Sequence, residues 1–177
     1  MNAKQRREKI LSILYSQTRA ISATQLADKF EVSRQIIVGD IALLRAKDHD
    51  IIATNQGYFL SDQLKSNPKH FTGRIACQHD SNRIEEELKI VISHGGAFEN
   101  VQVDHPVYGM ITAPLKIETE KDINHFMSLM NENNPDVSSL SSLTNGIHTH
   151  TIVCDDIIQF NSIKQALKEA NILLSDH

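Results

Sequence analysis

Two short helix-like segments separated by a brief break constrain the fold of this chain more than any other feature. The first covers residues 23–30 and the second runs from residue 34 to about 47, and both repeat apolar side chains at helical spacing. Ser22 and Ser33 stand directly before them, and serine is a favoured residue at a helix N-cap. Two helices joined by so tight a turn are typical of a helix-turn-helix motif.

The second helix opens with residue types that read DNA. Arginine pairs with guanine or phosphate, glutamine pairs with adenine, and serine contacts phosphate. We therefore predict that Ser33, Arg34 and Gln35 bind DNA, with Arg45 adding a basic side chain in the last turn. Gly39 lies inside the same helix, where it costs about 1 kcal/mol relative to alanine and offers no side chain to DNA. A helix-turn-helix used only for protein contacts is the alternative.

A further helix and a hairpin complete the first predicted domain, residues 1–62. Residues 3–16 have helical spacing, and two β-prone runs, residues 51–54 and 58–60, flank a turn that contains glycine. A hairpin directly after a helix-turn-helix is a wing. Residues 21–60 therefore resemble the winged helix-turn-helix at the front of bifunctional biotin ligases and many small-molecule repressors.

Charge is distributed unevenly along the chain. Residues 1–47 carry nine Lys and Arg against four acidic residues, a net charge of +5, so the rest of the chain carries −9 within a total of −4. A basic end on an acidic body is what a protein needs when only one end meets phosphates. The pattern favours a nucleic-acid contact at the N-terminal end.

Beyond a polar linker at residues 61–69, strand-like and helix-like segments alternate. The expected strands cover residues 72–78, 98–104, 110–117 and 147–153, and the expected helices cover residues 81–94, 119–132 and 160–174. This β-α-β-β-α-β-α order predicts a second domain, residues 70–177, built as a two-layer α+β fold with a mostly antiparallel sheet.

Two histidines on the last expected strand suggest a metal site. His148 and His150 are two residues apart, so both imidazoles point to one face of the strand. Paired imidazoles suit a borderline divalent metal. His79, just past the first strand, and Glu87, about two turns into the next helix, can complete the site if that helix packs over the sheet. Two surface or hydrogen-bonded histidines without a metal are the alternative.

Several functional classes are disfavoured. No run approaches the ~20 apolar residues of a membrane helix, and the basic N-terminus lacks the apolar core of a secretory signal. We therefore expect a cytoplasmic protein, with no membrane partner, in which Cys77 and Cys154 are reduced thiols. Neither cysteine has a CxxC partner, which disfavours a cysteine-based zinc site or a redox motif.

Several motifs together resemble the three-histidine (3H) domain. They are His79, Glu86-Glu87-Leu88, Gly95-Gly96, the segment VDHPVYG at 103–109 and the segment SSLTNGIHTHT at 141–151. The similarity runs from about residue 70 to the C-terminus, and in that domain the topology is similar to the phosphocarrier protein HPr. With the winged helix in front, the whole chain resembles the nicotinate-responsive repressors of NAD biosynthesis and niacin uptake genes, the NiaR/YrxA family. Asn145 stands where relatives often have glycine, and we expect that difference to be tolerated.

The resemblance implies one divalent transition metal per subunit, Zn, Ni, Fe or Mn, held by His79, Glu87, His148 and His150. It also implies nicotinic acid as co-repressor and a homodimer on a palindromic operator of double-stranded DNA.

Candidates for contact with nicotinic acid, chosen by closeness in sequence to the histidine motifs, are His105, Tyr108, Ser142 and Thr144. We expect a regulator and not an enzyme. The alternatives are a metal-responsive regulator without a niacin response and a metal-dependent hydrolase fused to a DNA-binding domain.

Overall fold

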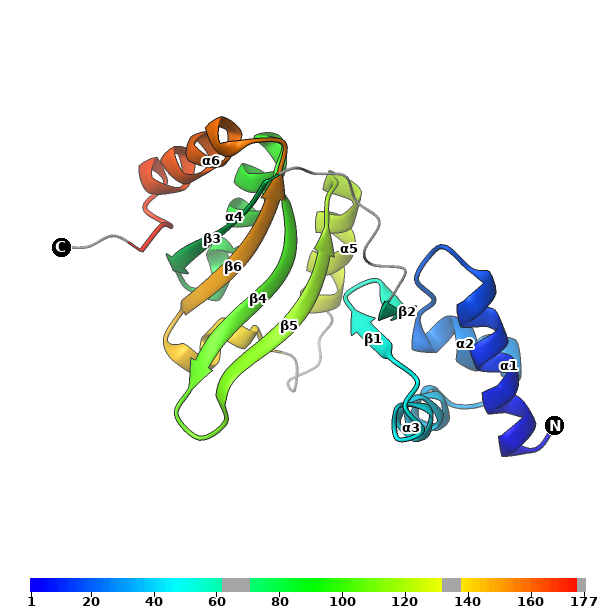
Figure 1. Ribbon diagram of the computed structural model, residues 1–177. Coiled ribbons are helices and arrows are strands. Elements are labelled where there is room, and N and C mark those ends of the chain that lie inside the picture. Colours follow the sequence, from blue (N-terminus) through cyan, green and yellow to red (C-terminus); the bar gives the residue numbers. More distant parts are fainter. Residues whose placement is uncertain (62–70, 132–137, 175–177) are drawn as a thin grey trace. The chain divides into compact units, whose positions relative to one another are not determined.

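The computed structural model describes residues 1–61, 71–131 and 138–174 (Figure 1). The chain forms two compact units, Met1–Asn67 and Pro68–His177, and each is described by itself. The expected linker at residues 61–69 falls almost wholly outside the described residues, so the predicted domain limits at 62 and 70 stay predictions. Within the described ranges, no helix has the length and hydropathy needed to cross a membrane.

The first unit contains three helices followed by a hairpin. Its elements are α1 (Ala3–Ser16), α2 (Ala23–Phe30), α3 (Arg34–Arg45), β1 (Ile51–Thr54) and β2 (Gly57–Leu60), with β1 and β2 paired antiparallel. The side chains of Ser22 and Ser33 accept hydrogen bonds from backbone N–H groups three residues on, so both predicted N-caps are confirmed. The α3 helix ends slightly before the expected residue 47, because the chain turns there and Asp48 takes a positive φ of 63°.

One polar cluster ties α1 to α3 beside an otherwise apolar core. Asp40 is buried on the inner side of α3, and its carboxylate receives Arg6 Nε at 2.5 Å and an Arg7 amino group at 3.2 Å. A buried carboxylate is tolerated only when it is paired. Arg6 and Arg7, which contribute to the positive charge of the N-terminal end, therefore stabilise the fold by pairing with Asp40.

The second unit is the expected α+β domain. Its strands are β3 (Phe71–Gln78), β4 (Ala97–His105), β5 (Gly109–Ile117) and β6 (Ile147–Cys154), and its α-helices are α4 (Ile84–Ser93), α5 (Glu120–Asn131) and α6 (Ile157–Glu169). Two short 3₁₀ segments, η2 (Ser81–Arg83) and η3 (Leu140–Thr144), lie before α4 and before β6. The predicted β-α-β-β-α-β-α order is confirmed, whereas η3 was not predicted.

The four strands form one sheet in the order β3-β6-β4-β5, and every neighbouring pair is antiparallel. The last strand in sequence therefore lies in the interior of the sheet, between β3 and β4 (Figure 1). Cys77 pairs with His148 and Ile75 with His150, which sets the register between β3 and β6. A β-bulge interrupts β4 between Phe98 and Asn100.

One face of the sheet is buried by the helices. The shared apolar cluster joins alternate residues of the strands to the inner sides of α4, α5 and α6, among them Ile75, Ile152, Leu88, Ile123 and Ile163. This alternation of buried and exposed strand residues is the pattern of a sheet with a single covered face. The helical layer thus packs over the strand face to which His148 and His150 belong.

The last helix differs from its expected limits of 160–174. Asp156 caps its N-terminus by accepting a hydrogen bond from the backbone N–H of Gln159, so α6 begins at Ile157. At the other end Asn171 has a positive φ of 55°, and residues 172–174 turn back along the outer edge of β3. The backbone N–H of Leu174 donates to the carbonyl of Ala76, which a continuing helix would prevent.

Candidate metal centre and DNA-binding helix

The structure brings the four predicted metal-binding side chains together. His79 follows β3, Glu87 is in the first turn of α4, and His148 and His150 lie on β6, and all four side chains are buried. The three imidazoles converge on the carboxylate of Glu87. His79 Nε2 lies 2.7 Å from Glu87 Oε2, and the Nε2 atoms of His148 and His150 lie 3.2 Å and 3.3 Å from Glu87 Oε1.

The other ring nitrogen of each histidine faces a backbone carbonyl oxygen. His79 Nδ1 lies 2.8 Å from the carbonyl of Asp80, His148 Nδ1 lies 2.8 Å from that of Gly146, and His150 Nδ1 lies 2.9 Å from that of Asn100. Because a carbonyl oxygen only accepts, each Nδ1 carries a hydrogen and donates. This contact fixes the tautomer and the ring orientation, as the outer partners of metal-binding histidines do.

Two local backbone features produce these contacts. The bulge in β4 lies beside Asn100, whose carbonyl oxygen accepts from His150 and whose side chain accepts from the backbone N–H of Thr151. On the other side, Gly146 has a φ of 82°, and a Cβ at this position would collide with the backbone carbonyl of His79. Glycine therefore lets the start of β6 approach the end of β3. Asn145 also takes a left-handed conformation, which asparagine tolerates well.

The electrostatics of the cluster favour a charged carboxylate. Burial by itself would raise the pKa of Glu87, but attraction to His150 and hydrogen bonds from the three imidazoles hold that pKa well below its usual range. Burial lowers the pKa of His79, whereas the hydrogen bond and the attraction to Glu87 raise it, and the net direction is upward. Glu87 is thus the anionic centre of a buried, histidine-lined site.

The donor set fits a divalent transition metal. With Nδ1 protonated, a neutral imidazole presents a lone pair at Nε2, and the carboxylate of Glu87 also presents only lone pairs. These groups face one another favourably only when a proton or a metal ion lies among them. One carboxylate can balance one imidazolium, and further buried positive rings would be costly. A single cation of higher charge satisfies the whole set.

Sequence reasoning missed one residue at this centre. Cys77 is fully buried on β3, and its Sγ, a carboxylate oxygen of Glu87 and a ring nitrogen of His148 lie within 4.8 Å of one another. The signal was present in the sequence, because Cys77 and His79 are two residues apart, as are His148 and His150. Residues two apart share one face of a strand, whereas the CxxC pattern covers only pairs of cysteines.

A pocket of about 210 Å³ opens beside the cluster. The four predicted metal-binding side chains form part of its wall, and serine side chains from residues 138, 139 and 141 line another part. Its apolar wall comes from α4, the middle of the β4–β5 hairpin, α5 and η3, and includes Ile84, Leu88, Val101, Leu115, Phe126 and Met130. A concave apolar space with a few converging polar groups is the usual form of a small-molecule site.

The predicted DNA-binding residues lie at the two ends of α3. Arg34 and Gln35 are exposed in its first turn, and Ser33 acts as the N-cap by accepting from the backbone N–H of Ile36 at 3.3 Å. Arg45 is exposed, but its Nε donates to the carbonyl of Ile51 at 2.7 Å, which links the helix to the wing. Their role in DNA binding stays a prediction.

Two apolar residues of α3 also reach the surface. Ile36 is 43% exposed and Leu43 is 51% exposed, whereas Ile37, Ile41 and Leu44 form the buried side of the helix. Exposed aliphatic side chains on a recognition helix can contact the methyl group of thymine.

Comparison with known proteins gives the chain a family. The 3H domain matches residues 72–176, and an HTH domain matches residues 6–59. The transcription repressor NadR of Bacillus subtilis is 40% identical over 171 residues, covering 97% of this chain and 94% of that protein. The probable transcription repressor NiaR of Thermotoga maritima is 35% identical over 173 residues, covering 98% and 95%.

This chain belongs to the 3H-domain family of transcription repressors. The similarity spans both units, so the winged helix-turn-helix and the α+β domain occur together in these relatives. The expected family and the expectation that the chain is not an enzyme agree with this finding.

In this 3H domain, the residues predicted to contact nicotinic acid do not line the pocket beside the histidines. His105 and Tyr108 lie at the turn between β4 and β5, where His105 Nδ1 accepts from the backbone N–H groups of Val107 and Tyr108. The hydroxyl groups of Ser142 and Thr144 donate to backbone carbonyls in and next to η3. The ligand-binding role of these four residues stays a prediction, and the pocket wall offers other candidates.

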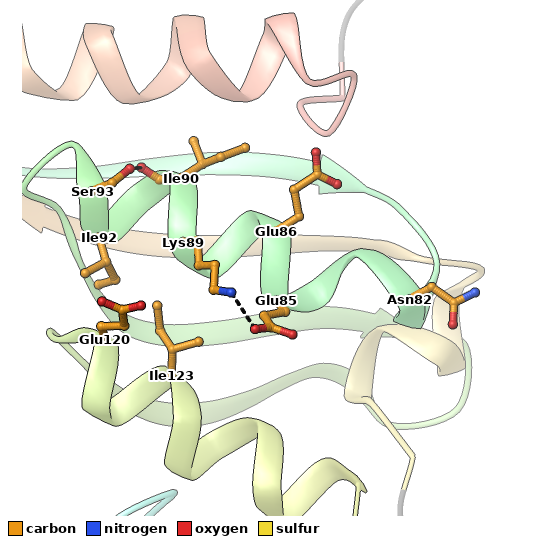
Figure 2. Close-up of a pocket in the computed structure, with 9 residues that line it drawn as sticks. All are labelled: Asn82, Glu85, Glu86, Lys89, Ile90, Ile92, Ser93, Glu120 and Ile123. Atoms are coloured by element: carbon orange, nitrogen blue, oxygen red, sulfur yellow. Dashed lines mark hydrogen bonds and ion pairs between the residues drawn. The ribbon is translucent and has the colours of Figure 1, made fainter.

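A second, wider hollow of about 660 Å³ lies on the outer surface of the same domain, between α4 and α5 (Figure 2). Glu85 and Glu86 line it, and Glu85 pairs with Lys89 at 2.6 Å. Glu87, the next residue, belongs to the buried side of α4 and is only 2% exposed. The carboxylates of Glu85 and Glu86 are therefore accessible to solvent and that of Glu87 is buried, although all three residues lie within one turn of α4.

Proposed function

We propose that this chain is a cytoplasmic repressor of NAD biosynthesis or niacin uptake genes that binds its operator when nicotinic acid occupies the pocket beside the metal centre. The supporting observation is the cluster of three imidazoles and one carboxylate, all buried, opening onto a 210 Å³ apolar pocket. This arrangement combines a cation site with a space suited to a small aromatic acid.

The metal centre is formed by His79, Glu87, His148 and His150, with one divalent ion per subunit. A bound transition metal would supply a Lewis-acidic position that a carboxylate or a pyridine nitrogen can occupy. The three carbonyl contacts at Nδ1 hold the rings in place for that purpose. Glu87 supplies negative charge at the buried end of the pocket.

The pocket itself selects for a flat, small ligand with one polar end. Phe126, Met130 and Leu115 provide the apolar surface on which an aromatic ring can pack. The serines at 138, 139 and 141 provide hydroxyl groups for the polar end of the ligand. A carboxylate can pair with the metal centre, and the uncharged amide of nicotinamide lacks that attraction.

The DNA-binding unit acts through α3. Arg34 and Gln35 reach base edges, Ser33 and Arg45 contact phosphates, and Ile36 and Leu43 add apolar contacts. In a homodimer two such helices read the half-sites of a palindromic operator, about one helical turn apart. Nicotinic acid favours the dimer geometry with that spacing, to the extent that it binds this state more tightly than the other.

The test is thermal unfolding of the metal-loaded protein with nicotinic acid, with nicotinamide, and with neither. A ligand that binds only the folded state raises the unfolding midpoint by mass action. We expect a rise with nicotinic acid and none after removal of the metal by a chelator.

No shift with either compound, together with a large shift on adding the metal alone, would instead identify a metal-responsive regulator. A nicotinic acid shift that persists in chelator would separate the ligand pocket from the metal.

A further inference from the structure

Cys77 occupies a different position from the other cysteine of the chain. Both side chains are fully buried on the covered face of the sheet. Cys154 lies at the far end of β6, where its thiol donates to the backbone carbonyl of Asp156 at 3.3 Å. Cys77 instead lies directly across from His148 in the β3–β6 pairing, with its Sγ among the atoms of the metal centre.

The distances place the sulfur among the potential ligands. One ligand atom each from Cys77, Glu87 and His148 lie within 4.8 Å of one another, so a single ion can reach all three. The carboxylate of Glu87 is shared with His79 and His150, whose Nε2 atoms also face it. Cys77 Sγ therefore lies beside Glu87 and His148 and is not a remote core residue.

The charge of a buried site gives an independent reason for a thiolate here. A divalent ion with three neutral imidazoles and the single carboxylate of Glu87 leaves one uncompensated positive charge. A buried net charge is costly, and buried ions are stabilised when they are fully paired. In the site without a bound acid, a thiolate at Cys77 brings the centre to neutrality.

We propose that Cys77 is a ligand of the metal centre, bound as a thiolate beside Glu87 and His148. The inference rests on the metal centre proposed above. When the metal–sulfur bond forms, the S–H bond breaks and its proton leaves to solvent.

A thiolate ligand narrows the choice of metal. Soft sulfur favours Zn, Ni and other later transition ions, whereas Mn prefers oxygen donors. The sequence and the family resemblance left Zn, Ni, Fe and Mn open. With Cys77 in the set, we expect the ions at the later end of the series to bind much more tightly than Mn.

The experiment is a titration of metal-free, full-length protein with Co²⁺, followed by absorbance. Cobalt bound by a thiolate has an intense near-ultraviolet charge-transfer band, and cobalt bound by any ligands in a low-symmetry site has weaker visible d–d bands. We expect both in the wild-type protein at one equivalent. In Cys77→Ser the charge-transfer band should be lost, with cobalt bound about 10- to 100-fold more weakly.

Cys154→Ser is the matched control, because it removes an equally buried thiol from the same sheet face and should keep the complete spectrum. Visible bands without the charge-transfer band in the wild-type protein would overturn the role of Cys77 and leave the metal centre standing. No cobalt spectrum at all would overturn the metal centre and the Cys77 inference together. Because the wild-type spectrum decides, the test holds even if Cys77→Ser folds poorly.

Discussion

The two functional regions of this chain are built in opposite ways. The residues proposed to bind DNA at the start of α3 are neighbours in sequence, exposed, and positioned by one capped helix. The proposed metal centre gathers side chains from the end of β3, the first turn of α4 and two positions on β6, and all of them are buried. A surface that must meet a partner can be local, whereas a site that must exclude water has to be enclosed by several segments.

The two regions also differ in how a buried carboxylate is balanced by positive charge. In the first unit Asp40 is buried against two arginines that remain partly exposed, so the basic surface of α1 is partly neutralised from inside. In the second unit Glu87 is buried among three imidazoles, which carry a balancing positive charge only when they are protonated. The first arrangement is complete as a structural ion pair, whereas the second would be balanced by the metal ion that we propose.

The largest expected effect is a difference in metal affinity between variants of two adjacent glutamates. Glu87→Gln removes the carboxylate of the proposed metal centre, and we expect metal affinity to fall by at least about 100-fold, because the imidazoles lose their anionic partner. Glu86→Gln changes an exposed side chain on the same turn and should leave affinity unchanged. Isothermal titration calorimetry measures both. Equal affinities for the two variants would show that burial of Glu87 has no role in metal binding.

A smaller effect is expected on DNA affinity, from a substitution at the exposed start of α3. Arg34→Ala should weaken DNA binding by about 1–3 kcal/mol, roughly 10-fold or more, because a charged contact to a base or phosphate is lost. The measurement is fluorescence anisotropy on a DNA site selected by the wild-type protein from a random pool.

Lys121→Ala removes the same charge from an exposed position on α5 and is the control. Unchanged metal affinity in Arg34→Ala would confirm that the two regions are separable, and unchanged DNA affinity would contradict the role given to α3.

The smallest effect is a change in local stability, and it should have opposite signs at two glycines. At Gly39 an added methyl group meets nothing within 4 Å, so Gly39→Ala should stabilise α3 by about 0.5–1 kcal/mol. At Gly73 on β3 the same methyl group collides with the ring of Phe160, so Gly73→Ala should destabilise the second unit. Hydrogen exchange of the backbone amides in each unit resolves the two changes. Slower exchange across α3 is expected for the first variant and faster exchange across the sheet for the second.

Much of the fold was predictable because its signals are local. Serine caps, helical spacing and a glycine-containing turn specified the winged helix, and alternation specified the strands of the second unit. The limits of α6 were not predictable in this way. They depend on a cap at Asp156 and on pairing of residues 172–174 with β3, which is a contact between distant parts of the chain.

The sequence alone determined which side chains can act: the imidazoles of the 3H motif, the carboxylates of α4 and the polar start of α3. The family motif already singled out Glu87 among three consecutive glutamates, but only the tertiary structure decided that Cys77 lies beside it and which residues line the pocket. The physical reason is that spacing along a strand or helix fixes the face a residue occupies. What lies opposite that face depends on strand order and helix packing, which arise from contacts across the whole domain.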